Sequence, residues 1–269
     1  MKTSKLKTAL ISTLAIFTLL TSSCSEDNSG DPIIPEQEIT QLVQAAEMDR
    51  ISASLEELII EIYEAQQGPA LTTCASITLV ENQNLKELTV TFQPDGCIIR
   101  DYAYSGELII TYEQVPQATE ILLNYVLNNF SIDNIELIGN NSILKELTNE
   151  NEKPQFTHAV DLTVIWPNGT QVSKVGQVIR EWTTKNNVFT NNVFDITGSW
   201  MTTFPTGSPH SYEAITPVKR IMTCNYFVSG LVNVSHNLYG GVLDYGAGSC
   251  DNIARFTFGN GNEINMILD

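Results

Sequence analysis

The chain has few basic residues, and its N-terminal apolar run is too short to span a membrane as a helix. Only 14 lysines and arginines stand against 31 aspartates and glutamates in 269 residues, a formal net charge of −17. So acidic a chain repels phosphate backbones and anionic lipid surfaces, which excludes nucleic acid as an expected partner. The apolar run at residues 8–20 is shorter than the roughly 20 residues of a spanning helix.

Sequence signatures of catalysis are also missing. The three histidines, His158, His210 and His236, are far apart along the chain and lack metal-ligand spacing. There is no Gly-x-Ser-x-Gly elbow, no His-Glu-x-x-His motif and no phosphate-binding loop. We therefore expect a non-catalytic protein without a cofactor, with a hydrolase as a weaker alternative.

The N-terminal segment predicts export and lipid attachment. Residues 1–7 carry three lysines and no acidic residue, residues 8–20 are mostly apolar, and small residues then precede Cys24. This order is typical of a secretory signal. It resembles the lipobox of bacterial lipoproteins, in which the chain is cut before an acylated cysteine, although Thr21 stands where the lipobox has leucine. Residues 1–23 are thus the predicted signal peptide and Cys24 the predicted site of lipidation, palmitate included. The alternative is ordinary signal cleavage, which leaves Cys24 a free thiol.

Residues 24–37 predict a flexible tether. Residues 25–32 are polar, acidic and poor in apolar side chains, so they cannot bury enough surface to fold. An acidic patch directly behind the cysteine resembles the surface-export signal of Bacteroidota lipoproteins. That resemblance implies an outer-membrane protein, anchored by the lipid on Cys24 and exposed at the cell surface. Loss of the three signal lysines takes the net charge from −17 to −20.

One amphipathic helix is predicted over residues 38–67. Gly68 and Pro69 end it, because glycine caps helices and proline cannot continue them. An acidic polar face is unlike that of a membrane-surface helix, so we expect the helix to pack on a sheet. Its apolar stripe, with helical spacing, consists of Leu42, Val43, Ala46, Ile51, Leu55, Leu58, Ile59 and Ile62. The opposite face carries Glu47, Glu56, Glu57 and Glu64.

Residues 70–269 predict a β domain. Apolar and polar residues alternate in short segments, separated by turn residues and without intervening helices. The expected fold is mainly β: a long antiparallel meander, open, sandwich-like or partly closed, with the N-terminal helix packed on it. The predicted strands are residues 76–80, 88–92, 106–112, 120–130, 135–139, 159–166, 170–182, 193–204, 226–234, 241–245, 255–258 and 263–268.

Four cysteines besides Cys24 predict two disulfides. Cys74 and Cys97 enclose a strand, a turn and a second strand over 23 positions, and Cys224 and Cys250 enclose the same order of parts over 26. Four cysteines allow three connectivities. The matching context favours Cys74–Cys97 and Cys224–Cys250. Four free cysteines, the alternative, fit poorly with an oxidising compartment.

The C-terminal region resembles a known group of proteins. Residues 241–254 contain Leu-Asp-Tyr-Gly-Ala-Gly-Ser-Cys-Asp-Asn, which is similar to the C-terminal signature of a group of Bacteroidota (Flavobacteriia-type) cell-envelope lipoproteins. Residues 94–97, 180–182, 196–198 and 216–218 agree with that group, although Pro94 departs from its glycine-rich turn. The resemblance implies an envelope location and β architecture, and it implies no activity.

The C-terminal signature also contains weak candidate calcium ligands. Asp244, Asp251 and Asn252 could supply side-chain oxygens to Ca²⁺. Asp and Asn beside glycine are, however, common turn formers whose side chains bond their own backbone. We prefer the turn interpretation and expect no metal.

Aromatic residues could form a stacking platform for a glycan. The alternative is that they belong to the core, which is the default for aromatics on strands. The candidates are Trp166, Trp182, Trp200, Tyr102, Tyr104 and Tyr112.

The expected function is therefore a structural or binding role in the cell envelope. The membrane, through the lipid on Cys24, is the expected partner, and a glycan or an envelope protein is the candidate ligand. A surface glycan-binding lipoprotein is the main alternative. A lipid-binding half-barrel, which needs an uncovered apolar concave face, and a hydrolase are weaker ones.

Overall fold

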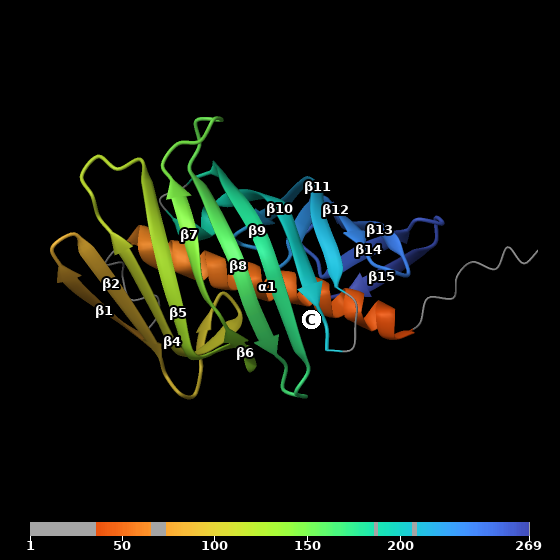
Figure 1. Cartoon of the computed structure of the whole chain (residues 1–269), viewed down its shortest axis with the longest axis horizontal. Coiled ribbons are helices and arrows are strands. Elements are labelled where there is room, and N and C mark those ends of the chain that lie inside the picture. The colour runs from red at the N-terminus through yellow and green to blue at the C-terminus, as the bar shows by residue number, and fades with distance from the viewer. Residues whose placement is uncertain (1–35, 66–73, 186–187, 206–208, 269) are drawn as a thin grey trace, which may run out of the picture. The chain divides into compact units, whose positions relative to one another are not determined.

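The computed structural model describes residues 36–65, 74–185, 188–205 and 209–268. In these ranges the chain forms one α-helix at the N-terminal end and a single 15-stranded antiparallel sheet (Figure 1). This confirms the expected mainly-β class. The described residues all belong to one compact unit. The predicted signal peptide, Cys24 and residues 24–35 of the predicted tether lie outside the described residues. Residues 36–37, predicted as the end of the tether, instead form the start of the helix.

The strands follow one another along the chain with short connections. A short 3-10 turn, η1 (Phe189–Asn191), precedes the tenth strand. The strands are β1 (Ala75–Asn82), β2 (Leu85–Phe92), β3 (Cys97–Ile99), β4 (Tyr102–Glu113), β5 (Glu120–Ile132), β6 (Ile135–Ile138), β7 (Asn140–Glu146), β8 (Gln155–Ile165), β9 (Gln171–Thr184), β10 (Val193–Thr203), β11 (His210–Ile221), β12 (Phe227–Ser235), β13 (Gly240–Ala247), β14 (Ile253–Phe258) and β15 (Glu263–Ile267).

The sheet is a meander with two side branches. Its hydrogen-bonded order runs from β1 to β15 in chain sequence, except that β3 pairs only with β4, and β7 lies between β5 and β8 beside β6. Within the described residues β1 and β15 each have one neighbour, so the sheet is open at both edges. Three strands, β3, β7 and β11, were not predicted from the sequence.

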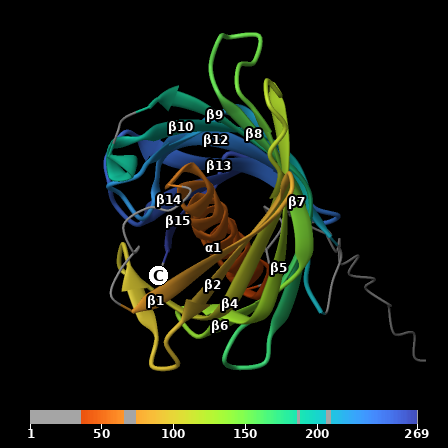
Figure 2. The same ribbon diagram turned by 90° about the vertical axis from the view of Figure 1, so that its left-hand side faces the viewer.

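Two glycines occupy bulges where the sheet bends. The pairing register slips between Ser105 and Glu107 in β4 and between Ile196 and Ser199 in β10. Gly106 and Gly198 lie in these slips with φ of 85° and 123°. A Cβ added there would come within 2.1 Å and 2.2 Å of a carbonyl oxygen on the neighbouring strand, so only glycine fits. Bulges of this kind bend a sheet, and Figure 2 shows the sheet curving around the helix.

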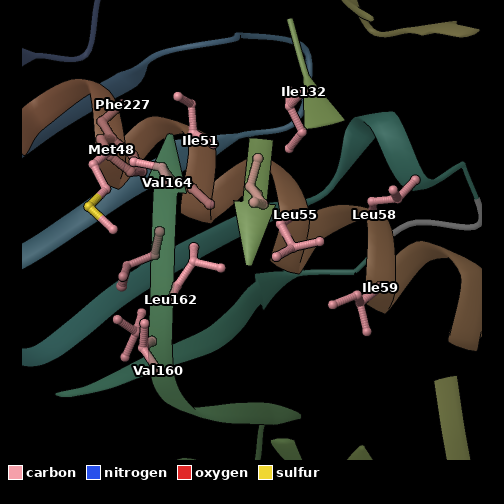
Figure 3. Close-up of a cluster of buried hydrophobic side chains, with 14 of the residues drawn as sticks. Met48, Ile51, Leu55, Leu58, Ile59, Ile132, Val160, Leu162, Val164 and Phe227 are labelled. Atoms are coloured by element: carbon pink, nitrogen blue, oxygen red, sulfur yellow. The ribbon is translucent and has the colours of Figure 1, made fainter. Parts of the chain in front are cut away.

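The helix, α1 (Glu36–Ala65), runs along the concave face of the sheet (Figures 1 and 2). Every residue of its predicted apolar stripe is buried except Val43, which is half-buried. Apolar side chains of the helix and of the strands form one core between α1 and the sheet. This core includes Met48, Ile51, Leu55, Leu58, Ile59, Ile132, Val160, Leu162, Val164 and Phe227 (Figure 3).

The face of the helix that was predicted to be polar is not exposed to solvent. Glu47, Glu56 and Glu57 lie on the predicted polar face, yet they are buried, and Glu64 is half-buried. The curved sheet reaches around the helix and supplies cations to Glu56, Glu57 and Glu64, whereas Glu47 pairs with Arg50 of the helix itself. Their burial is therefore compensated by ion pairs.

Both predicted disulfides are present. Cys74 is bonded to Cys97 and Cys224 to Cys250. The first ties the start of β1 to β3, and the second ties the chain before β12 to the chain after β13. Each bond therefore links the two ends of a hairpin and its exit loop, as the matching sequence contexts predicted.

Candidate metal centre

Three side chains from distant parts of the sequence meet beside the first turn of α1. Glu38 Oε2 lies 3.8 Å from His210 Nε2 and 3.5 Å from His236 Nδ1. The two imidazole rings are 4.4 Å apart between centroids. One ligand atom from each of the three residues lies within 4.8 Å of the other two, and this is the one such cluster among the described residues.

Strand pairing brings the two histidines together. Ser211 in β11 pairs with Ser235 in β12, so the adjoining His210 and His236 lie at the same end of the ladder. His210 begins β11, and His236 follows the last residue of β12. The first turn of α1 passes this end of the ladder and places Glu38 next to both rings. The three histidines are far apart in the sequence, and the fold brings two of them together.

The cluster contains polar atoms that lack partners. The His210 side chain is 0 % exposed, that of His236 is 4 % and that of Glu38 is 15 %. Glu38 Oε2 and His210 Nε2 are both buried, and neither has a hydrogen-bond partner in the part of the chain that the structure describes. Because unsatisfied buried polar atoms are costly, each needs an explanation such as a bound ion.

The protonation state of His210 suits a metal ligand. Burial, together with the charge of His236, lowers the pKa of His210 to about 4, so its imidazole is neutral at pH 7. The hydroxyl of Tyr212 lies 3.3 Å from Nδ1 and can accept a hydrogen bond from it. That arrangement leaves the Nε2 lone pair directed at Glu38, as metal ligation requires.

His236 also offers a lone pair. Its Nδ1 accepts a long hydrogen bond from the backbone N–H of Leu238, with the two nitrogens 3.5 Å apart. An accepting nitrogen carries no proton, so it can bind a metal ion in exchange for this weak bond.

Two imidazoles and a carboxylate are a ligand set typical of zinc. Zinc–ligand bonds of about 2.1 Å in a tetrahedron place neighbouring ligand atoms roughly 3.4 Å apart. The observed 3.5 Å and 3.8 Å from Glu38 Oε2 to the two imidazole nitrogens are close to this spacing. All three ligand atoms lie within 4.8 Å of one another, so the two imidazole nitrogens must also move closer when an ion binds. Calcium, which prefers oxygen ligands alone, fits this set poorly.

Aromatic rings enclose the cluster. Phe204 lies 5.2 Å from His210, and Tyr239 lies 5.0 Å from His236, between ring centroids. Burial, with a contribution from the charge of Glu38, raises the pKa of the Tyr239 hydroxyl. These rings exclude water from the ligand atoms, which strengthens electrostatic interactions with a cation.

The weak calcium candidates make other contacts. Asp244 Oδ1 accepts a hydrogen bond from the Gly246 N–H at 2.8 Å, and its Oδ2 binds Arg255 at 3.0 Å. Asp251 Oδ1 accepts from the Ile253 N–H at 3.0 Å, and Asn252 donates to the carbonyl of Leu268. These contacts agree with the turn interpretation that was preferred from the sequence.

The candidate glycan platform lies in the core. Trp182, Trp200 and the three candidate tyrosines are buried, and Trp166 is half-buried. Trp182 stacks on Phe194 at 5.3 Å and Trp200 on Tyr212 at 5.8 Å between centroids. The core interpretation of these aromatics is therefore confirmed for five of the six.

A second polar group has the order of a hydrolytic triad. His158 Nδ1 lies 2.8 Å from Glu56 Oε1, and its Nε2 lies 2.8 Å from the hydroxyl of Tyr125. All three residues are 1 % exposed, and Arg180 forms an ion pair with Glu56. A nucleophile in such a position cannot meet a substrate, so the group is better understood as an internal link between α1 and the sheet.

Comparisons with known protein families, with curated proteins and with solved structures found no match. The resemblance to envelope lipoproteins thus stays a prediction. Among the described residues no helix is both long and apolar enough to cross a bilayer.

Proposed function

We propose that this chain is a lipid-anchored cell-envelope lipoprotein of the outer membrane whose non-catalytic body binds a divalent transition-metal ion, with Zn²⁺ the best fit. One observation carries the metal-binding role: Glu38, His210 and His236 converge with two buried ligand atoms that lack hydrogen-bond partners. The sequence predicted a binding role with an unknown ligand, and in this proposal that ligand is a metal ion.

The envelope location has support from the cysteines. Two structural disulfides are typical of proteins in an oxidising compartment such as the periplasm or the cell surface. The predicted signal peptide and the lipidation of Cys24 agree with that compartment. The lipid anchor also supplies the membrane partner expected from the sequence.

The other expected roles have less support. A glycan platform needs solvent-facing aromatics, and five of the six candidates are buried. A lipid-binding half-barrel needs a free concave face, and α1 runs along that face here (Figure 2). Binding is favoured over hydrolysis because His210 is fully buried among aromatic rings.

Metal titration tests the proposal. The chain without its signal peptide is stripped with a chelator and titrated with Zn²⁺ by calorimetry, and bound metal is counted by mass spectrometry. We expect one zinc per chain. His236→Gln and Glu38→Gln are expected to weaken binding by about 100-fold or more, since loss of even an outer-shell partner costs 10–100-fold.

Glu36→Gln is the matched control. Glu36 lies in the same helical turn as Glu38 and is exposed, so its variant should bind zinc like the wild type. A chain that binds no zinc, or variants at Glu38 and His236 that bind it as tightly as the wild type, would overturn the proposal.

A further inference from the structure

A fourth polar side chain lies against the cluster of Glu38, His210 and His236. The ring of Tyr239 is 5.0 Å from that of His236 and 5.9 Å from that of His210, between centroids. The hydroxyl oxygen of Tyr239 is buried and has no hydrogen-bond partner among the described residues. It is thus the third unsatisfied buried polar atom at this place, beside Glu38 Oε2 and His210 Nε2.

The position of Tyr239 is fixed by its turn and by packing. The backbone N–H of His236 donates to the carbonyl of Tyr239 at 2.9 Å, which closes the turn between β12 and β13. Phe256 and Phe258 contact the ring edge to face, at 6.1 Å and 5.9 Å between centroids. A ring held from several sides is pre-organised, as good ligand groups are.

The three clustered side chains do not by themselves complete the coordination of a metal ion. Three ligand atoms leave one tetrahedral position open. The candidate for that position is Tyr239 Oη, because it is buried without a hydrogen-bond partner among the described residues and its ring contacts both histidine rings.

We propose that Tyr239 Oη is the fourth ligand of the metal ion, closing a Glu-His-His-Tyr site. This inference rests on the proposed function. When the ion binds, a metal–oxygen bond forms at Oη, the O–H bond breaks, and the proton leaves to solvent; no atom changes its oxidation state. The ion's charge overcomes the penalty that burial imposes on the phenolate.

A phenolate ligand has a spectroscopic consequence. Phenolate bound to Cu²⁺ gives a charge-transfer band in the visible region, which imidazole and carboxylate ligands alone do not give. Cu²⁺ binds nitrogen and oxygen sites at least as tightly as Zn²⁺, so it can replace zinc as the probe.

The experiment is a Cu²⁺ titration of the signal-free chain, followed by visible absorption. We expect a charge-transfer band that saturates at one Cu²⁺ per chain. Tyr239→Phe should lose the band while it still binds one Zn²⁺, with affinity reduced about 10- to 100-fold. Tyr226→Phe, which removes the hydroxyl of another half-buried tyrosine residue, should keep the band.

The outcomes separate this inference from the proposed function. One bound Cu²⁺ without a band would overturn the role of Tyr239 and leave the three-ligand site standing. A band that persists in Tyr239→Phe would assign it to another tyrosine and overturn the inference as well. A chain that binds neither Cu²⁺ nor Zn²⁺ at the cluster would remove both proposals. Should Tyr239→Phe fail to fold, resonance Raman of the Cu²⁺-loaded wild type would decide whether a phenolate is bound.

Discussion

At the scale of single residues, the buried charges between α1 and the sheet determine the rotation and register of the helix on the sheet. Glu57 accepts two hydrogen bonds from Arg220, at 2.6 Å and 3.0 Å, and Glu56 is paired with Arg180 and His158. Buried ion pairs gain little net stability, because desolvation offsets their attraction. Breaking one leaves an uncompensated charge, so these pairs penalise any other rotation or register of the helix.

The pH dependence of stability should reflect Glu56. Burial alone would raise its pKa, but Arg180 and His158 outweigh burial and lower it to about 2, below the unfolded value of 4.5. A depressed folded pKa contributes stability above the unfolded pKa, and that stability is lost as pH falls from about 4.5 through about 2. We expect Glu56→Gln to lower the free energy of unfolding by about 3 kcal/mol at pH 7.

Urea unfolding of wild type and Glu56→Gln at pH 7, 4 and 3 measures this effect. The difference between the two should shrink as the pH falls. The exposed Glu120→Gln is the control and should follow the wild type at every pH. A constant difference across this range would show that the Glu56 carboxylate makes no pH-dependent contribution.

The residues of the metal cluster show where sequence reasoning stops. In the sequence, Glu38 is one helix residue among many, and His210 and His236 are isolated histidines. Metal-ligand spacing can be recognised in a sequence only when the ligands belong to one local element. Here the ligands come from three elements and meet through the pairing of β11 with β12. The disulfides could be predicted, because each frame is local and the two frames match.

At the scale of elements, sequence patterns identified α1 and most of the sheet. Of the strands that the sequence did not predict, β11 matters most, because it carries His210 and Arg220. Its pairing with β12 slips in register three times and Pro217 lies within it, so apolar and polar residues do not alternate cleanly. The polar face of α1 was misjudged because periodicity shows where charges lie, and only the curvature of the sheet decides whether they meet cations.

That curvature depends on glycine at the bulges. Gly198 has φ of 123°, and a Cβ there would lie 2.2 Å from the carbonyl oxygen of Gln177. We expect Gly198→Ala to lower the free energy of unfolding by about 2 kcal/mol or more, because backbone strain and a backbone clash add.

Thermal and urea unfolding of the Gly198→Ala variant check this expectation. Gly259→Ala is the control, since the nearest atom to its added Cβ is 3.6 Å away. Equal stability of the two variants would mean that the bulge in β10 relaxes without cost.

At the scale of the whole molecule, a metal ion would join the start of the helix to the C-terminal half of the sheet. Glu38 belongs to the first turn of α1, whereas His210 and His236 belong to β11 and the turn after β12. An ion that binds only the folded chain raises the free energy of unfolding by about 2.7 kcal/mol at 100 times its dissociation constant.

We therefore expect zinc to raise the unfolding temperature of the wild type and a chelator to reverse the shift. His236→Gln should show no shift at the same zinc concentration. Calorimetry of both proteins, with and without zinc, provides the measurement. An unchanged wild-type temperature at saturating zinc would mean that the ion does not bind the folded cluster in preference to the unfolded chain.

The proposed lipid anchor would determine where this body works. If Cys24 is acylated, Cys24→Ala should move the protein from the membrane fraction of expressing cells to the soluble fraction, because no other anchor is predicted. Ser25→Ala keeps the cysteine and should stay with the membrane. Fractionation and blotting test both variants, and a Cys24→Ala protein that remained in the membrane pellet would exclude the lipid anchor. Protease treatment of intact cells then locates the body: loss of signal places the metal cluster outside the cell, where it meets environmental zinc, and protection until lysis places it in the periplasm.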